Sequence, residues 1–389
     1  MTNRLSLTGN EAAAHALRQA QPDVAAAYPI TPQTELMHQF SEFVANGDVD
    51  TEMILVESEH SAMSAAVGAS AAGARTVTAT SANGLALMWE IVYIAASSRL
   101  PIVMPEVNRA LSGPINIHCD HSDTMGCRDS GWIQIYAENA QEAYDTTLQA
   151  FRIAEHPDVL LPVMIPFDGF IISHTNELVE MLDDKDAAEF VGEYKALRSL
   201  LDVENPMTLG PLDLQDFYFE HKRQQVDAMR QAYRVIGEVG REFGQRFGRE
   251  YSYIEEYLMD DAEVAIVAIG STCGTARAAA DLVREEGIKA GVVKMRVFRP
   301  FPVAEVVAAL GKVNVVGVMD RCISFGLEGG PLFHEIRSHL YGHSKPVLPF
   351  VYGLGGRDIR VDQIADAFRK LASAEAETTC EVEFVGVRE

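Results

Sequence analysis

The sequence predicts an α/β protein with two domains, each built on a parallel sheet. From residue 5 to about 175, helix-like stretches alternate with short apolar runs, and a second set of such runs begins at residue 264. This alternation is typical of parallel strands joined by helices. The length of 389 residues also exceeds what one hydrophobic core usually organises, which favours two domains over one.

The strands of the first domain are expected where Val, Ile and Ala gather without polar alternation. Such runs are apolar on both sides, as in strands that helices cover on both faces of a sheet. They are Val24–Pro29, Met53–Glu57, Thr76–Thr80, Pro101–Val107 and Val159–Ile165. In an open parallel sheet, ligands bind beyond the carboxyl ends of the strands, so the residues that follow each run are candidates for a site.

A charged region separates the two sets of strands. Charges are dense in Glu180–Lys195, and Val226–Phe247 has the pattern of an amphipathic helix with a mostly polar surface. We interpret residues 178–260 as a helical linker region. The first domain then covers residues 1–255, most of this linker included, and the second covers residues 256–389.

The second domain repeats the α/β pattern on a smaller scale. Its expected strands are Val264–Ile269, Gly291–Val297, Val313–Met319 and Val347–Val351, with helices at Thr275–Glu286 and Ala304–Leu310. Pro302 before the second helix, and Gly287 and Gly311 after the two helices, support these boundaries. The glycine-rich strings 325–330 and 353–358 do not match the dinucleotide-binding fingerprint, which argues against a Rossmann dehydrogenase.

Composition excludes several classes of protein. The formal charge of −24 opposes binding to nucleic acid, which requires clustered Lys and Arg. No apolar stretch is long enough to span a membrane and no leader opens the sequence, so we expect a cytoplasmic protein. The five cysteines form no Cys-x-x-Cys pair, so we expect no iron–sulfur cluster in this chain and treat the thiols as small buried hydrophobes.

The first two strands lead into polar residues at helix starts. Thr31 and Pro32 suit an N-cap and the first helical position, where free N–H groups attract an anion such as a substrate carboxylate. The alternative is that Thr31 only caps its own helix. After the second strand, Ser58 is a candidate cap and Glu59 lies in the first helical turn. Glu59 could share a proton with a ring nitrogen, or could only complement the helix dipole.

The residues that follow the next two predicted strands give weaker indications of a binding site. Thr80–Gly84 allows close backbone approach before the apolar helix Leu85–Ala96, as many tight turns do. Arg109 follows the fourth strand, and its planar guanidinium suits a carboxylate, although an internal ion pair with Glu106 or Asp129 is an equal alternative. The loop that follows carries His118, Asp120, His121 and Asp123, whose spacing matches no known metal site, so we assign no metal to this chain.

Ordered strings along nearly the whole chain resemble the α subunits of pyruvate:ferredoxin oxidoreductases, in the 2-oxoacid:ferredoxin oxidoreductase family. They are Tyr28-Pro29-Ile30-Thr31-Pro32, Glu57-Ser58-Glu59-His60, the stretch from Thr80 to Met88, Val107-Asn108-Arg109-Ala110, Arg128 to Gln134, Asp168-Gly169-Phe170 before Ser173-His174-Thr175, Arg296 to Pro302 and Gly355-Gly356-Arg357-Asp358. The resemblance implies a transketolase-like, pyrimidine-binding domain for thiamine diphosphate, followed by a domain like the transketolase C-terminal domain.

The resemblance also implies roles for three residues. Glu59 would contact N1′ of the aminopyrimidine, as a carboxylic acid that favours the imino tautomer and so helps remove the thiazolium C2 proton. Thr31 and Arg109 would receive the carboxylate of the substrate beside the cofactor. They follow different strands, and the expected sheet brings their ends to one edge.

The resemblance further implies partners. Thiamine diphosphate would be shared with a β subunit that holds its diphosphate, Mg²⁺ and a [4Fe–4S] cluster. A γ subunit, and often a ferredoxin-like δ subunit, would complete the complex. The implied reaction is the CoA-dependent oxidative decarboxylation of pyruvate to acetyl-CoA and CO₂, with electrons passed to ferredoxin or flavodoxin, or the reverse. The alternatives are a relative acting on 2-oxoglutarate, a branched 2-oxoacid or oxalate, and a non-catalytic scaffold subunit.

Overall fold

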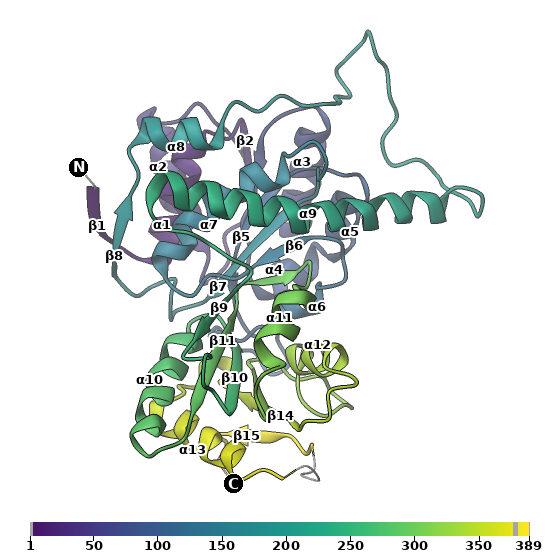
Figure 1. Cartoon of the computed structure of the whole chain (residues 1–389). Coiled ribbons are helices and arrows are strands. Elements are labelled where there is room, and N and C mark those ends of the chain that lie inside the picture. Colours follow the sequence, from purple (N-terminus) through teal and green to yellow (C-terminus); the bar gives the residue numbers. More distant parts are fainter. Residues whose placement is uncertain (1–2, 376–379, 389) are drawn as a thin grey trace.

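The computed structural model describes residues 3–375 and 380–388 and contains two large sheets flanked by helices, together with a small two-stranded sheet (Figure 1). The larger sheet has seven strands in the order β12-β6-β7-β5-β4-β2-β3, and the smaller has six in the order β15-β14-β13-β10-β11-β9. The prediction of two mostly parallel α/β domains is therefore confirmed. In the part of the chain that is described, no helix is long and apolar enough to cross a membrane.

The first sheet contains all five predicted strands and two that the sequence did not reveal. The strands are β2 (Val24–Ala27), β3 (Glu52–Leu55), β4 (Thr76–Val77), β5 (Val103–Asn108), β6 (Ile133–Ile135), β7 (Val163–Asp168) and β12 (Val297–Arg299). The pairs are parallel except at β12, which comes from the second half of the chain and joins β6 antiparallel. A strand from after the linker thus completes the first sheet.

Alternate side chains of the buried strands enter two cores on opposite faces of this sheet. Val103 and Val107 pack with helices α1 (Gly9–Ala20), α2 (Thr34–Asn46) and α7 (Ala140–Ala154). Met104, between them, packs on the other face with helices α3 (Glu59–Ala71), α4 (Ala82–Leu87) and α5 (Trp89–Ser97). The helix expected at Leu85–Ala96 is thus two short helices that meet at Met88.

The predicted linker is more varied than a helical connection. It contains β8 (Glu177–Met181), which pairs antiparallel with β1 (Asn3–Leu7), the short helix α8 (Asp184–Val191) and the long helix α9 (Tyr218–Phe247). Helix α9 starts eight residues before the expected helix and ends with it, and it buries Val235, Val239 and Phe243 in the core of the first sheet. Helix α9 is therefore integral to the first domain.

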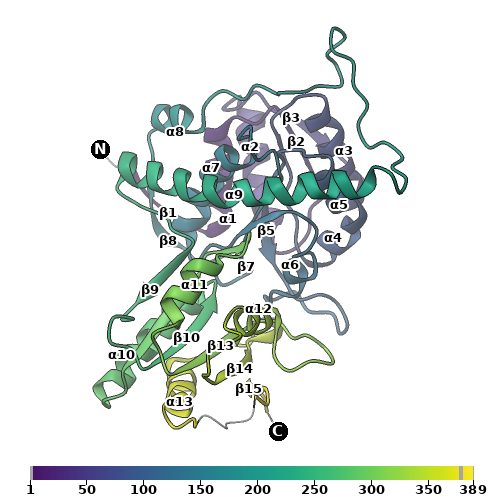
Figure 2. The same ribbon diagram turned by 45° about the vertical axis from the view of Figure 1, so that its right-hand side comes forward.

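The second sheet holds the four predicted strands and adds one at each edge. Its strands are β9 (Ile254–Tyr257), β10 (Val264–Ile269), β11 (Ala290–Met295), β13 (Val315–Asp320), β14 (Val347–Tyr352) and β15 (Glu383–Val385). Its helices are α10 (Thr272–Glu285), α11 (Val303–Leu310), α12 (Pro331–His339) and α13 (Val361–Ala372). Figure 2 shows this domain below the first sheet. It contacts Asp168 at the carboxyl end of β7 through Ser271 and Arg321.

Candidate active site

Glu59 is the first residue of α3, as the sequence predicted. Ser58 caps the helix, because its hydroxyl accepts a hydrogen bond from the N–H of Ser61 at 3.3 Å. The Glu59 side chain is 7% exposed, yet among the described residues no group donates a hydrogen bond to its carboxylate or pairs with it. A carboxyl group that is taken out of bulk water without a protein partner has its hydrogen-bonding capacity left for a ligand.

A glycine lies directly against this carboxylate. A Cβ on Gly84 would lie 2.8 Å from Oε1 of Glu59 and 2.5 Å from Oγ1 of Thr80. The Thr80 hydroxyl is buried and has no hydrogen-bond partner in residues 3–375 and 380–388. The turn after β4 was a weak signal in the sequence, but here it forms a cradle in which two side-chain oxygens face a position that only glycine keeps clear.

Arg109 directly follows β5, and its guanidinium is turned to main-chain carbonyls. Its side chain donates from Nε to the carbonyl of Asn116 at 2.9 Å and from Nη1 to the carbonyl of Thr31 at 2.9 Å. Neither Glu106 nor Asp129 pairs with it, so the internal ion pair that the sequence left open is not formed. Two of its five N–H donors are used, and its positive charge has no carboxylate partner among the described residues.

Thr31 adjoins Arg109 but does not cap a helix, so the N-cap prediction was wrong. The carbonyl of Ile30 accepts hydrogen bonds from the N–H groups of Gln33 at 2.8 Å and Thr34 at 3.1 Å, and this turn delays the start of α2. Gln33 then occupies the cap position without a side-chain hydrogen bond to the helix, and its Oε1 instead accepts one from the N–H of Ile30 at 3.4 Å. Thr31 is exposed, and its carbonyl orients Arg109.

Asp123 connects the turn beside Glu59 to Arg109. It is buried, and its Oδ2 accepts hydrogen bonds from the N–H of Ala82 at 3.1 Å and of Arg109 at 2.8 Å. Behind it lies the buried carboxyl of Glu106. Burial, together with the neighbouring Asp123, raises the pKa of Glu106 well above its usual value. The raised pKa favours the neutral form of Glu106, and a neutral carboxyl group can share this space with Asp123.

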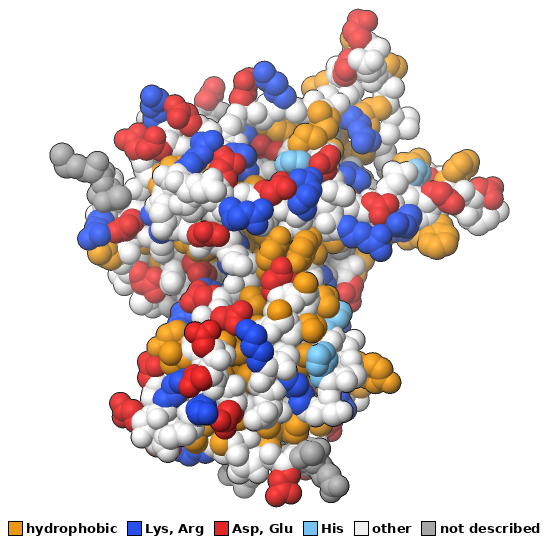
Figure 3. Space-filling model, viewed as in Figure 1, with side chains coloured by type: hydrophobic (Ala, Val, Ile, Leu, Met, Phe, Trp, Pro, Cys, Tyr) orange, Lys and Arg blue, Asp and Glu red, His pale blue; other side chains and the backbone are white. Residues whose placement is uncertain are grey.

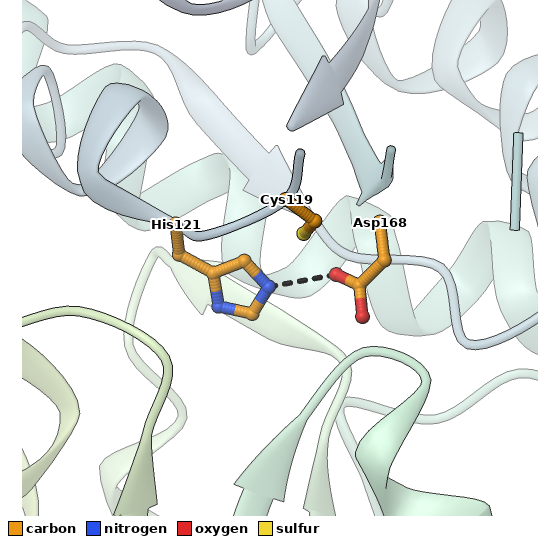
Figure 4. A group of neighbouring side chains, drawn as sticks. All are labelled: Cys119, His121 and Asp168. Carbon is orange, nitrogen blue, oxygen red and sulfur yellow. Dashed lines mark hydrogen bonds and ion pairs between the residues drawn. The ribbon is translucent and has the colours of Figure 1, made fainter. Parts of the chain in front are cut away.

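A second polar cluster joins the two domains (Figure 4). His121 Nε2 lies 2.7 Å from Oδ1 of Asp168, and Arg321 Nη1 lies 3.2 Å from Oδ2. Burial alone would raise the pKa of Asp168. The positive charge of Arg321 and the hydrogen-bonded His121 together outweigh this effect, so the pKa lies below its usual value. Ser271 donates two further hydrogen bonds to Oδ2 of Asp168, one from its N–H and one from its hydroxyl.

Cys119, His121 and Asp168 place potential metal ligands close together, but their surroundings favour an ion pair. The Arg321 guanidinium already neutralises Asp168, and burial raises the pKa of the Cys119 thiol well above its usual range. A thiol that stays protonated is a poor metal ligand. A second acidic group, formed by Glu138, Glu142 and Glu255, likewise surrounds the ammonium of Lys294.

Sequence reasoning missed Asp123 as a link and the Asp168–Arg321 pair altogether. Asp123 was considered only as part of a polar loop, and no local pattern distinguishes it. Asp168 and Arg321 are separated by 153 residues, so their pairing depends on how the two domains meet. The signal that could have found Asp168 is its position at the carboxyl end of a buried strand.

Comparison with known proteins shows which family the chain belongs to. Residues 15–241 match the family model described as pyruvate flavodoxin/ferredoxin oxidoreductase, thiamine diP-bdg, and residues 262–364 match pyruvate:ferredoxin oxidoreductase core domain II. The chain belongs to this family. It is 56% identical to pyruvate synthase subunit PorA of Thermotoga maritima, over 100% of this chain and 99% of that protein. The ketoisovalerate oxidoreductase subunit VorA of Pyrococcus abyssi is 47% identical over 92% of this chain and 91% of that one.

Solved structures share the fold of this oxidoreductase chain. The 2-oxoglutarate:ferredoxin oxidoreductase from Magnetococcus marinus, with 2-oxoglutarate, coenzyme A and succinyl-CoA bound, aligns with a TM-score of 0.71 at 19% identity and covers 95% of this chain and 65% of that one. An inactive tetramer of a split-gene transketolase aligns with a TM-score of 0.57 at 14% identity, over 94% of this chain and 98% of that one. The transketolase-like architecture implied by the resemblance is thus confirmed.

The residues at the site fit part of the cofactor named in the family's description. Glu59 offers a carboxyl group and Thr80 a hydroxyl, both without a partner among the described residues, and Gly84 places no side chain against either of them. These groups suit a small heteroaromatic ring with polar edges, such as an aminopyrimidine. None of the three is cationic, so they do not suit a diphosphate.

Proposed function

We propose that this chain binds the aminopyrimidine of thiamine diphosphate and the carboxylate of a 2-oxoacid within a multi-subunit pyruvate:ferredoxin oxidoreductase. The complex would convert pyruvate and CoA to acetyl-CoA and CO₂, with electrons passed to ferredoxin or flavodoxin, or run in reverse. The observation that carries the proposal is Glu59, a largely buried carboxyl group with no protein partner beside the cradle at Gly84. The relatives named pyruvate synthase subunit PorA support pyruvate as substrate.

Glu59 supplies a proton-sharing group at a fixed position. As the first residue of α3 it is held by the capped helix, and its carboxylate packs against Gly84, where no side chain competes for its position. A carboxyl group there can hold a proton on a ring nitrogen, which is general acid–base catalysis. Thiamine diphosphate, when bound, supplies the carbon nucleophile that attacks the 2-oxo group.

Arg109 and Thr31 supply the substrate site. The N–H donors of Arg109 that the carbonyls of Thr31 and Asn116 leave free can bind a carboxylate, and its charge is unneutralised within the chain. Thr31 is exposed beside it and can add a hydroxyl contact. Holding the carboxylate fixes the 2-oxo group for attack, a gain in orientation rather than in binding alone.

We further propose that partner subunits complete the site. A β subunit would hold the diphosphate, Mg²⁺ and a [4Fe–4S] cluster, beside a γ subunit and a ferredoxin-like δ subunit. Four of the five cysteines are buried singly within this chain, which supports placing the clusters elsewhere. The word "subunit" in the relatives' names supports a complex of this kind.

The test is anaerobic purification through a tag on this chain, followed by 2-oxoacid- and CoA-dependent reduction of a viologen dye. Pyruvate should give the highest kcat/KM among pyruvate, 2-oxoglutarate, 2-oxoisovalerate and oxalate. A preference for 2-oxoisovalerate would support the second candidate, a branched-chain enzyme, which the VorA relative favours. An inactive chain that no co-expressed subunit restores would contradict both enzymatic proposals and favour the scaffold role.

A further inference from the structure

Residues 193–219 project from the protein, and we call this segment the arm. Figures 1 and 2 show it leaving the first domain above α3 and α5 and returning at the N-terminal turns of α9, which also extend beyond the body. Residues 193–217 contain neither helix nor strand. A connection of this length within a compact domain is uncommon and usually has a function of its own.

The arm turns large apolar side chains to solvent. Val203 is 84% exposed, Leu212 is 89% exposed and Phe219 is 77% exposed. The same holds for Leu197, Leu200, Leu201, Leu214, Phe217 and Tyr218. Figure 3 shows apolar side chains at the projecting end of α9 and along the arm, interspersed with acidic ones. Apolar groups gathered in this way on a projecting segment mark an interaction surface.

The base of the arm is fixed to the helices next to the candidate active site. Ser199 Oγ donates to the carbonyl of Ala72 at 2.6 Å, and the N–H of Leu200 donates to the carbonyl of Ala71 at 2.9 Å, both at the end of α3. Leu209 packs against the core that α3, α4 and α5 share. The arm is therefore held in place at its base while its apolar side chains remain uncovered.

Apolar surface continues from the arm over these helices. Leu87 is 53% exposed on α4, and Trp89 and Ile94 are 40% and 38% exposed on α5. A groove runs between the end of α5, arm residues 207–213 and the first turns of α9. A partner that covered α4 and α5 would thus meet the arm at the same side of the domain.

The charge of the arm indicates what kind of partner fits. It carries Glu193, Asp202, Glu204, Asp213 and Asp216 against Lys195 and Arg198, a formal net charge of 2 − 5 = −3. The whole chain carries −24, so a second copy would meet the arm with charge of the same sign. A different chain, with Lys and Arg around an apolar groove, is the complementary surface.

We propose that the arm docks into a different subunit of the oxidoreductase complex, one that presents an apolar groove rimmed by Lys and Arg. The proposal rests on the proposed function only in requiring that the chain works in a complex of unlike subunits. The docking element is the arm itself, which is anchored next to the helices that carry Glu59 and Gly84.

The first experiment compares two double variants of the tagged chain, co-expressed with its complex partners. Leu212→Ser with Leu214→Ser alters the arm, and Phe325→Ser with Leu327→Ser is the matched control on exposed residues of the second domain. Native mass spectrometry should show at least a tenfold loss of one other subunit for the arm variant and none for the control. Unchanged subunit composition in the arm variant would overturn the proposal.

A second experiment needs no destabilising substitution. A photo-crosslinking residue at position 212 should link the wild-type complex to an apolar segment, flanked by Lys or Arg, of a different subunit. The arm amides should also exchange at least tenfold more slowly in the complex than in the isolated chain. A crosslink to a second copy of this chain, or an arm that exchanges equally fast in both states, would overturn the proposal.

The two proposals fail in different ways. If pyruvate is not oxidised while the complex still depends on the arm, the proposed function fails and the docking proposal stands. If Glu59→Gln abolishes turnover while arm variants assemble normally, the docking proposal fails and the proposed function stands.

Discussion

Glu59 and Asp168 are both buried carboxylates at the carboxyl end of the first sheet, but they differ in what surrounds them. Asp168 is fully buried, and Arg321, His121 and Ser271 satisfy it. Glu59 is 7% exposed and has no partner among the described residues. Burial alone therefore does not distinguish a structural carboxylate from a functional one; the presence or absence of protein partners does.

The difference follows from where the second domain lies. It covers the carboxyl end of β7 and supplies Ser271 and Arg321 to Asp168. It supplies no hydrogen bond to Glu59, which follows β3 at the edge of the sheet. The second domain thus covers one part of this edge and not the other, and it is at the uncovered part that we propose the binding of the cofactor and of another subunit.

The largest expected effect is on turnover at Glu59. Glu59→Gln keeps the size of the side chain but cannot share a proton in the same way, so kcat should fall by about 10²–10⁴-fold. The free energy of unfolding should stay unchanged, because no protein partner is lost. Viologen reduction measures kcat, and urea unfolding measures the free energy of unfolding. Glu57→Gln, two residues away and exposed, is the control and should retain full turnover.

Asp168→Asn should show the opposite pattern, with a large loss of stability. It leaves the Arg321 guanidinium buried without its carboxylate, which costs about 3–5 kcal/mol. Denaturant unfolding of the purified chain measures this loss. The matched control is Asp362→Asn, which removes an exposed partner of Arg360 and should leave the free energy of unfolding nearly unchanged, because solvent screens exposed ion pairs. Equal losses for the two variants would contradict the structural role given to Asp168.

Gly84→Ala tests the cradle beside Glu59. The added Cβ would lie 2.5 Å from Thr80 Oγ1 and 2.8 Å from the Glu59 side chain, so both must move. A shift of this size should lower kcat by about 10²-fold, and strain should cost about 1–3 kcal/mol of stability. Gly126→Ala is the control, because its Cβ would meet only Trp89, at 3.5 Å. Full activity of Gly84→Ala would show that turnover does not depend on a glycine beside Glu59 and Thr80.

Arg109→Lys sharpens the assignment of the substrate site. Lysine keeps the charge but loses the planar fork that binds two carbonyls and that we propose also binds the substrate carboxylate. We expect KM for pyruvate to rise about tenfold, as for the loss of one charge-assisted hydrogen bond. Steady-state kinetics over a range of pyruvate concentrations measures this, and an unchanged KM would place the substrate carboxylate elsewhere.

The smallest effect is expected from the buried carboxyl of Glu106. Because burial raises its folded-state pKa, its contribution to stability is complete below the usual glutamate pKa and is lost as pH rises through the folded-state pKa. Glu106→Gln cannot ionise, so above the usual glutamate pKa its stability should fall less steeply with pH than that of the wild type, by at most about 1.4 kcal/mol per pH unit. Unfolding curves from acid pH upward test this, and parallel pH profiles for the two proteins would argue against a raised pKa of Glu106.

The sequence predicted the parts of this molecule that local pattern controls. All nine expected strands exist because apolar runs between helices have few other ways to be buried. Glu59 was placed correctly at a helix start because Ser58 is a strong N-cap. The expected domain boundary after residue 255 stays a prediction, as do the roles of Glu59, Thr31 and Arg109.

Longer-range features were not predictable in the same way. The three-residue strands β6 and β12 are too short for a periodic signal, and β12 reaches the first sheet from the second half of the chain. The cap at Thr31 failed because two N–H groups bind Ile30 instead. The Asp168–Arg321 pair and the partners of Asp123 arise only when distant segments meet.

The most direct test of the account is the rate of hydrogen exchange at C2 of thiamine diphosphate bound to the assembled complex. This exchange precedes any reaction with the substrate, so it isolates the step assigned to Glu59. We predict that Glu59→Gln slows it by at least tenfold, with the complex intact and the cofactor bound. The same exchange rate in the wild type and in Glu59→Gln would contradict the central claim that this unpartnered carboxyl group serves the cofactor.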